Sequence, residues 1–227
     1  MSVDRFGKEY FEDGTLSNYK GYNYDPYYEK RARIFKEIFN CQRLLDIGCA
    51  KGFQVLGFNK IGVEAYGVDI STYAITNAPK EIAHRLYVHD INIDRLPFRD
   101  NMFDFIYCSE TLEHIENMEN AVSEMNRVLI RSGLLYITTP HPDSQAAKHD
   151  RTHINIHDYE WWKTLLSRCG FNSKRLKTPP VIADFGSFNR VIPKHIRIYL
   201  ARVNASKKHL YESIFILARK EHENDQK

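Results

Sequence analysis

Short apolar runs alternate with longer amphipathic stretches along most of the chain. The apolar runs have the length of β-strands and lie at 43–47, 64–70, 86–90, 103–108, 134–139 and 171–177. The amphipathic stretches have helical length and lie at 29–39, 52–60, 71–78, 118–130 and 158–169. Regular alternation of strand and helix predicts an α/β fold, with a doubly wound, mostly parallel sheet and helices on both faces.

Two sequence features predict where helices end. Pro79 ends the helix at 71–78, because its ring disfavours a helical conformation in the residues before it. The run Arg131-Ser132-Gly133 is expected to end the helix at 118–130 through a glycine C-cap. A last apolar run at 210–218 predicts a final strand.

The segment 10–28 differs from the rest of the chain. It contains six tyrosines among Gly, Asn and Asp and few aliphatic residues, which predicts a turn-rich, ordered loop. Since it has no strand to pair with, we expect it to close over bound molecules. The predicted organisation is a tyrosine-rich cap with the first helix at 1–39, one domain at 40–220 and a polar tail at 221–227.

Length and composition fit a single domain. The 227 residues are 43% hydrophobic, which is enough for one substantial core. The sequence shows neither a run of eighteen apolar residues nor a charged-then-apolar leader, so we expect a cytoplasmic protein. The four cysteines form no C-x-x-C pair, which favours reduced thiols over a disulfide frame or a zinc site.

The stretch 44–53 (LLDIGCAKGF) predicts a strand followed by a glycine-containing turn that opens a helix. Gly48 and Gly52 permit backbone angles and close approaches that a Cβ would hinder, and the helix start offers free N–H groups. This arrangement is typical of nucleotide-cofactor loops. A dinucleotide fingerprint would require glycine where Ala50 and Phe53 stand, so the pattern disfavours NAD.

Two further acidic residues follow predicted strands. Asp69 ends the second strand, 21 positions after Gly48, where a carboxylate can bind ribose hydroxyls, although it could instead cap the helix near Ser71. Asp90 ends the third. The run 96–108 (LPFRDNMFDFIYC) and then 110–115 (ETLEHI) complete four ordered motifs. Together these motifs resemble the class I S-adenosylmethionine (SAM) methyltransferases, in the UbiE-like, methyltransferase type 11 branch, over roughly residues 40 to 178.

The resemblance implies a Rossmann-like, seven-stranded sheet in which the final strand lies antiparallel between the fifth and sixth. It also implies SAM as cofactor and S-adenosylhomocysteine as product. The aminoacyl end would be held by Asp46 and the loop with Gly48, Cys49, Ala50 and Gly52, the ribose by Asp69 with Ile70, and the adenine by Asp90 with Ile91. Ser109, after the fourth strand, joins this predicted cofactor set, and all ten residues are expected at the carboxyl edge of the sheet.

Three histidines follow the fourth and fifth strands and are candidate bases. Alignment of an acceptor with an activated methyl group supplies most of the acceleration, whereas a hydroxyl acceptor also benefits from a general base. His141 and His153 lie in an irregular loop and are favoured over His114, which belongs to the shared Leu-Glu-His run. His153 lies in DRTHIN, which resembles a segment of methyltransferases that act on sugars and other polar small molecules.

A metal-assisted alternative also fits the sequence. Glu110, Glu113 and His114 match the Glu-x-x-Glu-His motif of RNA 3′-terminal ribose 2′-O-methyltransferases, and histidines at 141, 149, 153 and 157 could complete a divalent-ion site. Leu-Glu-His is, however, common in metal-free relatives. We therefore expect no metal.

The C-terminal quarter is basic. Residues 174–220 contain eleven Lys or Arg and two acids, and four of these bases lie in an insertion at about 180–206. A solvated basic face would explain it. Docking of an anionic acceptor, such as a phosphate-bearing saccharide, or contact with an acidic lipid surface are functional alternatives. Nucleic acid fits less well, because the insertion lacks the aromatic platforms of single-strand binders. The sequence does not indicate an oligomeric state.

The predicted function is transfer of a methyl group from SAM to an O or N atom of a small polar or glycan-type acceptor. The alternatives are the metal-assisted RNA enzyme, a non-catalytic SAM-binding subunit and an NAD-linked oxidoreductase.

Overall fold

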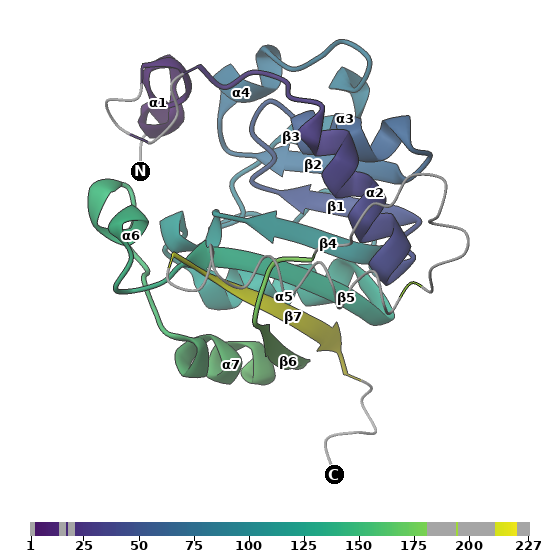
Figure 1. The fold of residues 1–227 in the computed structure, drawn as a ribbon, viewed down its shortest axis with the longest axis vertical. Coiled ribbons are helices and arrows are strands. Elements are labelled where there is room, and N and C mark those ends of the chain that lie inside the picture. The colour runs from purple at the N-terminus through teal and green to yellow at the C-terminus, as the bar shows by residue number, and fades with distance from the viewer. Residues whose placement is uncertain (1–2, 14–16, 18–20, 181–193, 195–211, 222–227) are drawn as a thin grey trace.

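The computed structural model describes residues 3–13, 17, 21–180, 194 and 212–221, and a seven-stranded sheet forms its centre (Figure 1). The strands lie in the order β3-β2-β1-β4-β5-β7-β6. All neighbours are parallel except β7, which runs antiparallel to β5 and to β6. The strands are β1 (Arg43–Ile47), β2 (Glu64–Asp69), β3 (Leu86–Val88), β4 (Phe103–Ser109), β5 (Leu129–Pro140), β6 (Phe171–Leu176) and β7 (Ser213–Lys220). The predicted topology, including the antiparallel strand between β5 and β6, is confirmed.

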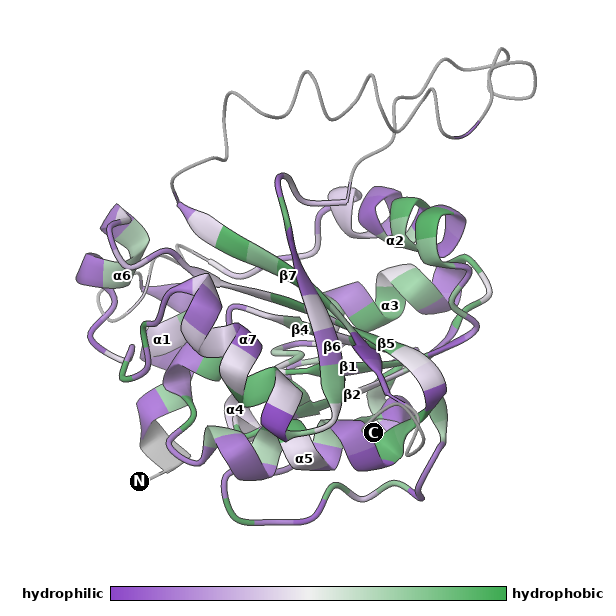
Figure 2. Cartoon of the chain, turned by 90° about the horizontal axis from the view of Figure 1, so that it is seen from below, coloured by the Kyte–Doolittle hydropathy of each residue, from purple (hydrophilic) through white to green (hydrophobic). Residues whose placement is uncertain are grey.

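Helices cover both faces of this sheet (Figure 2). One apolar cluster joins α2 and α3 to the sheet, and another joins α5 and α7 to its opposite face. The main helices are α2 (Tyr27–Phe39), α3 (Phe53–Lys60), α4 (Thr72–Thr76), α5 (Met118–Val128) and α7 (Tyr159–Arg168). The shorter ones are η1 (Val3–Phe6), α1 (Lys8–Glu12), η2 (Ala83–Arg85), η3 (Leu112–His114) and α6 (Gln145–His149).

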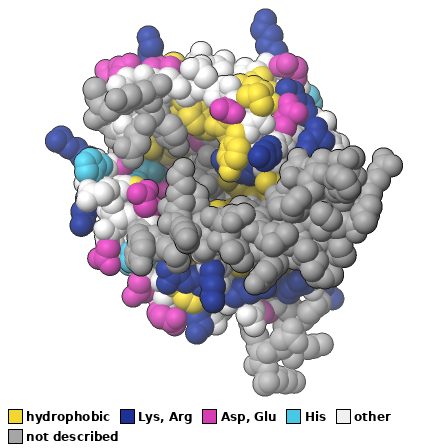
Figure 3. All heavy atoms as spheres, in the orientation of Figure 1, with side chains coloured by type: hydrophobic (Ala, Val, Ile, Leu, Met, Phe, Trp, Pro, Cys, Tyr) yellow, Lys and Arg dark blue, Asp and Glu magenta, His cyan; other side chains and the backbone are white. Residues whose placement is uncertain are grey.

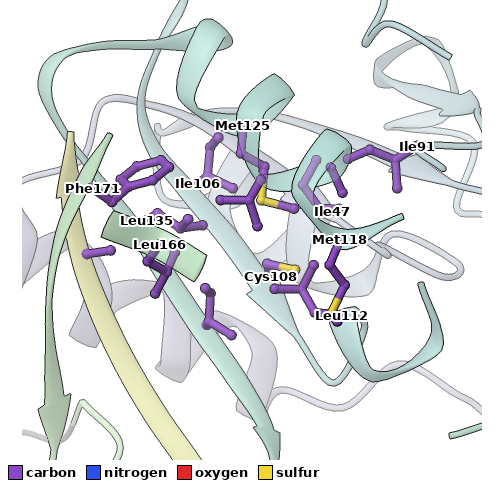
Figure 4. Close-up of a cluster of buried hydrophobic side chains, with 14 of the residues drawn as sticks. Ile47, Ile91, Ile106, Cys108, Leu112, Met118, Met125, Leu135, Leu166 and Phe171 are labelled. Carbon is purple, nitrogen blue, oxygen red and sulfur yellow. The ribbon is translucent and has the colours of Figure 1, made fainter. Parts of the chain in front are cut away.

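Strand β4 shows why the central strands are apolar along their whole length. Phe105 and Tyr107 pack on the α2 and α3 side, whereas Ile106 and Cys108 point to the α5 and α7 side (Figure 4). All four side chains are buried. A parallel strand covered on both faces needs apolar residues at successive positions, and each such side chain contributes roughly 1.5–3 kcal/mol on burial.

The end of α5 differs from the prediction. The helix ends at Val128 rather than at residue 130, and Leu129 is already extended. Residues 131–133 do not cap the helix but lie within β5, where Ser132 has φ +59°. The pairing of β4 with β5 jumps from Phe103 opposite Leu129 to Phe105 opposite Leu134, so these residues form a bulge.

Other boundaries also shift. The prediction of a loop over 10–28 is wrong at its two ends, because Tyr10 lies in α1 and α2 already begins at Tyr27. The predicted final strand at 210–218 corresponds to β7, with 210–211 outside the described residues. Most of the basic insertion and residues 222–227 of the polar tail lie outside them as well. Within the described ranges, none of the helices has both the length and the apolar character needed to cross a membrane.

Candidate cofactor and acceptor site

A cavity of about 350 Å³ lies at the carboxyl ends of β1, β2 and β4. Ligands of open α/β sheets bind at this edge, where the strand order reverses. In the space-filling view, hydrophobic side chains gather near the middle of the face shown, with charged side chains around them (Figure 3). Of the ten predicted cofactor residues, the wall includes Asp46, Gly48, Cys49, Ala50, Asp69, Ile70, Asp90, Ile91 and Ser109.

Gly52 does not line the cavity. It precedes α3 with φ +73°, and a Cβ there would lie 2.6 Å from a Leu86 methyl and 2.7 Å from an Ile82 methyl. Gly48, which does line the cavity, has φ +74°, and its Cβ would lie 2.2 Å from Thr111 Oγ1. The two glycines therefore act differently: Gly52 permits packing against η2 and β3, and Gly48 permits close approach of the first turn to the loop after β4.

Four N–H groups of this turn are already bonded within the protein. Gly48 N and Cys49 N donate to Val68 O at 2.9 and 3.1 Å, and Gly52 N donates to Cys49 O at 2.8 Å. Ala50, held at φ +49°, donates its N–H to Asp69 Oδ2 at 2.7 Å. A pyrophosphate bound by such a turn would need several of these donors. The loop is therefore built for shape and not for phosphate.

Asp69 is a structural and a cavity residue at once. Besides the bond from Ala50, its Oδ1 accepts the N–H of Ser71 at 2.8 Å. Ser71, rather than Asp69, caps α4, through Oγ and the Ala74 N–H. Burial raises the pKa of Asp69, and burial next to Asp69 raises that of Asp46 well above its usual range. The pair is therefore a site where a cationic group would relieve an electrostatic cost.

Asp90 sits in the loop after β3, because this strand ends at Val88 and not at residue 90 as predicted. Its Oδ1 accepts both the backbone N–H and the side-chain N–H of Asn92, at 2.9 and 2.8 Å. Asn92 Oδ1 in turn accepts the N–H of Glu116 at 2.8 Å. Asn92 also lines the cavity. It is not among the residues predicted from the sequence, and only its position two residues after Asp90 could have indicated it.

Arg31 of α2 reaches the wall from the other side. Its Nη1 donates to the Tyr107 hydroxyl at 2.9 Å, and its guanidinium lies 4.9 Å from the centre of the Tyr27 ring. Asp46, Asp69, Asp90 and Glu110 line the same cavity. Four carboxyl groups and one guanidinium thus suit a cationic ligand better than an anionic one. No sequence motif marked Arg31, because α2 precedes the motif region.

The N-terminal segment bridges the two sides of the cavity. Lys51 Nζ pairs with Glu12 at 2.5 Å, and Ser71 Oγ donates to Phe6 O at 2.6 Å. On the other side, Arg5 Nη2 donates to Thr152 O at 2.5 Å. Figure 1 shows α1 and α6 beyond the carboxyl ends of the parallel strands. The rings that this segment and the start of α2 contribute to the wall are Phe6, Tyr10, Phe11, Tyr22 and Tyr28.

The three candidate histidines occupy different places. His114, at the end of η3, lines the cavity and contacts the ring of Phe6. His153 lies behind it, with ring centres 4.9 Å apart, and is not among the lining residues. His141 is not a lining residue either, and its Nδ1 accepts the N–H of Asp143 at 3.2 Å. The sequence favoured His141 and His153, whereas the cavity exposes His114.

Two carboxyl groups accompany His114, one on an exposed residue and one on a buried residue. Glu110 is exposed and lines the cavity at φ +52°, an uncommon angle for a residue other than glycine, and desolvation of its carboxyl raises its pKa. Glu113 is fully buried, neither of its carboxyl oxygens has a hydrogen-bond partner in the described part of the chain, and burial raises its pKa well above the usual range. Glu113, His114 and His153 each bring one potential ligand atom within 4.8 Å of the others.

The comparisons with known proteins agree with this architecture. Residues 45–137 match the family described as a methyltransferase domain. The uncharacterized methyltransferase YcgJ of Bacillus subtilis is 29% identical over 119 residues, covering 50% of this chain and 47% of that protein. Malonyl-[acyl-carrier protein] O-methyltransferase of Enterobacter lignolyticus is 28% identical over 102 residues, covering 45% and 40%. The chain thus spans about half the length of these curated relatives, or less.

Solved structures share the fold. A SAM-dependent methyltransferase of Archaeoglobus fulgidus matches with a TM-score of 0.62 at 21% identity, over 85% of this chain and 92% of that one. The crystal structure of YcgJ matches with a TM-score of 0.59 at 18% identity, over 85% and 99%. Residues 45–137 thus match a methyltransferase domain, and the chain shares the fold of SAM-dependent methyltransferases.

Proposed function

We propose that this chain binds SAM in the cavity and transfers a methyl group to an O or N atom of a small polar or glycan-type acceptor. The observation that carries the proposal is the convergence of Asp46, Asp69 and Asp90 on one cavity, beside a turn in which four N–H groups are already bonded. Such a wall fits a cofactor with cationic groups and ribose hydroxyls. It offers little to the pyrophosphate of a dinucleotide, which argues against the NAD alternative.

Each side chain has a role that its position supports. Asp46, next to Asp69 and with a raised pKa, would pair with the cationic aminoacyl end, and Asp69 and Ile70 would hold the ribose. Asp90, Ile91 and Asn92 would bound the adenine. The first turn contributes shape through Gly48 and Cys49, since their N–H groups bond elsewhere.

On the acceptor side, positioning of the acceptor contributes more to the rate than its chemical activation. Bound SAM supplies a methyl group on a sulfonium, and alignment of an acceptor with it contributes up to roughly 7–11 kcal/mol. For a hydroxyl acceptor, His114 would take the O–H proton as the O–CH₃ bond forms. Burial and the neighbouring His153 lower the pKa of His114 to about 4, so that the imidazole is neutral and able to accept a proton at pH 7.

The acceptor class is inferred from chemistry at the cavity and from the DRTHIN segment. Glu110, Thr111 and His114 present polar groups beside the rings of Phe6 and Tyr10, a mixture that suits a hydroxylated molecule with apolar faces. The relative from Enterobacter lignolyticus is named an O-methyltransferase. An anionic acceptor or a lipid surface would dock on the basic insertion, and a nucleic-acid acceptor is not proposed.

A screen for release of S-adenosylhomocysteine tests the function. Purified chain, SAM and panels of sugars, sugar phosphates and small hydroxylated or amine acceptors should yield product above the no-acceptor background. With an acceptor in hand, His114→Ala should lower kcat by about 10²–10⁴-fold if the acceptor is a hydroxyl. The matched variant His141→Ala, at a residue that does not line the cavity, should retain activity. SAM binding without turnover on any acceptor would favour the non-catalytic subunit.

One observation favours a metal-assisted reaction as the second candidate. The Glu113, His114 and His153 cluster offers two imidazoles and one carboxyl group, a donor set that suits zinc, manganese or cobalt better than magnesium. Titration of the chain with Co²⁺ should then give a saturable 1:1 visible absorption band that Glu113→Gln removes. Absence of that band, with activity insensitive to chelators, would exclude this candidate.

A further inference from the structure

Thr152 connects a buried carboxylate to His114. Its hydroxyl Oγ1 lies 2.5 Å from Asp150 Oδ1 and 2.9 Å from His114 Nδ1. Its backbone carbonyl lies 3.2 Å from the same Nδ1. Asp150 and Thr152 are both buried, and the Thr152 N–H also donates to Asp150 Oδ1 at 2.8 Å. The geometry of this short loop is therefore held at both ends.

The positions of the protons follow from these contacts. A carbonyl oxygen can only accept, so the contact between Thr152 O and His114 Nδ1 requires a proton on Nδ1. The single hydroxyl proton of Thr152 goes to Asp150, since an ionised carboxylate can only accept. Oγ1 is then left to accept from His114 Nδ1 as well. Both contacts thus call for the same tautomer.

We propose that Asp150 and Thr152 are positioning residues that hold His114 as the Nδ1–H tautomer and aim its Nε2 lone pair at the acceptor side of the cavity. Thr152 is not on the cavity wall, whereas the His114 ring is, so the ring edge opposite Nδ1 faces the ligand space. A neutral imidazole carries one ring proton, and the contacts of the loop decide which nitrogen holds it. The catalytic value of this tautomer rests on the proposed function.

The other charged and titratable groups near the ring come from three elements. His153 and Asp150 belong to the loop after α6, Arg5 to η1, and Glu113 to η3 itself. His153 and Arg5 oppose protonation of His114, and Asp150 favours it. Because Arg5 also donates to Thr152 O, two donors share that carbonyl. The N-terminal segment therefore takes part in the same arrangement.

Nitrogen NMR of the imidazoles tests this directly and needs neither SAM nor an acceptor. In ¹⁵N-histidine-labelled protein at pH 7, the signal absent from His114→Gln should show a protonated Nδ1 and an unprotonated Nε2. Thr152→Val should shift the tautomer ratio toward Nε2–H by about fivefold, which is about 1 kcal/mol for one neutral hydrogen bond. Thr152→Ser should restore the wild-type ratio, and Thr164→Val, at an exposed position of α7, should leave it unchanged.

A wild-type His114 that is protonated on Nε2 would overturn the proposal whether or not any variant folds. An unchanged ratio in a folded Thr152→Val protein would overturn the role of Thr152. Failure of SAM binding would refute the proposed function while leaving the NMR result standing, so the two claims fail separately.

Discussion

The two sides of the cavity are assembled in different ways. The cofactor side is made from turns that directly follow β1, β2 and β3, and backbone hydrogen bonds hold it, such as those from Ala50 and Ser71 to Asp69. The acceptor side joins His114 to Thr152, 38 positions later, through side chains, with Arg5 from the N-terminal segment. Local backbone geometry thus shapes the proposed cofactor side, and long-range side-chain contacts shape the proposed acceptor side.

Substitution of Gly48 should cause the largest loss of SAM affinity, because Gly48 lies on the cofactor side. In Gly48→Ala the new Cβ meets Thr111 Oγ1 at 2.2 Å and the backbone keeps φ +74°, so we expect SAM affinity to fall by more than about 100-fold, equivalent to more than about 2.7 kcal/mol. Calorimetric titration with SAM measures it.

Gly62→Ala is the matched control for that experiment. Gly62 also has φ +74°, but a Cβ there would meet nothing closer than Lys36 Nζ at 3.9 Å. It should lower stability by about 1 kcal/mol and leave SAM affinity unchanged. Equal affinities of the Gly48 and Gly62 variants would contradict the close-approach role of Gly48.

Removal of the Asp69 carboxylate should weaken SAM binding by about 12- to 150-fold, because one charge-assisted hydrogen bond to ribose contributes about 1.5–3 kcal/mol. The variant is Asp69→Ala, measured by calorimetry on protein with cooperative unfolding. Asp104→Ala is the control, since Asp104 also accepts two backbone N–H groups, from Gln42 and Arg43, but does not line the cavity. Unchanged affinity in Asp69→Ala would refute the ribose assignment.

His114, on the acceptor side, should make the free energy of unfolding fall in acid. Its pKa is about 4 in the folded protein and about 6.5 when unfolded, so between these values only the unfolded chain binds the proton and stability falls as pH falls. Between pH 7 and pH 5, the wild type should lose about 2 kcal/mol more unfolding free energy than His114→Gln. Urea titrations at both pH values measure the difference, and equal losses would show that His114 is not buried in its neutral form.

The smallest effect is expected for the N-terminal segment, on its rate of proteolytic cleavage. If it closes over bound ligand, S-adenosylhomocysteine should slow proteolytic cleavage within residues 10–28 several-fold. Lys51→Met, which breaks the pair with Glu12, should speed that cleavage. Lys163→Met, which breaks an exposed pair with Glu160, should not. A cleavage rate that the ligand leaves unchanged would argue against a lid.

Sequence patterns predicted most of the fold because the strand and helix periods and the strand-end motifs are local. The strands and the positions of Asp46 and Asp69 near strand ends follow from such signals, whereas the antiparallel placement of β7 followed from the family resemblance that the motifs carry. The end of α5 was missed because the bulge at residues 131–133 depends on how β5 pairs with β4.

Long-range contacts explain the rest of the differences. Arg31 reaches the cavity through its bond to Tyr107, which is 76 positions away, and no local motif encodes that contact. Likewise, the sequence favoured His141 and His153 over His114, because it does not show which ring reaches the cavity. Only packing shows that His114 lines the cavity, with His153 behind it and His141 not among the lining residues.

Calorimetric titration of the wild-type chain with SAM, S-adenosylhomocysteine and NAD tests the central claim most directly. We expect saturable 1:1 binding of SAM and of S-adenosylhomocysteine and no binding of NAD, because acids line the cavity and four N–H groups of the first turn are bonded internally. Binding of NAD, or no binding of SAM by a chain that unfolds cooperatively, would contradict the account.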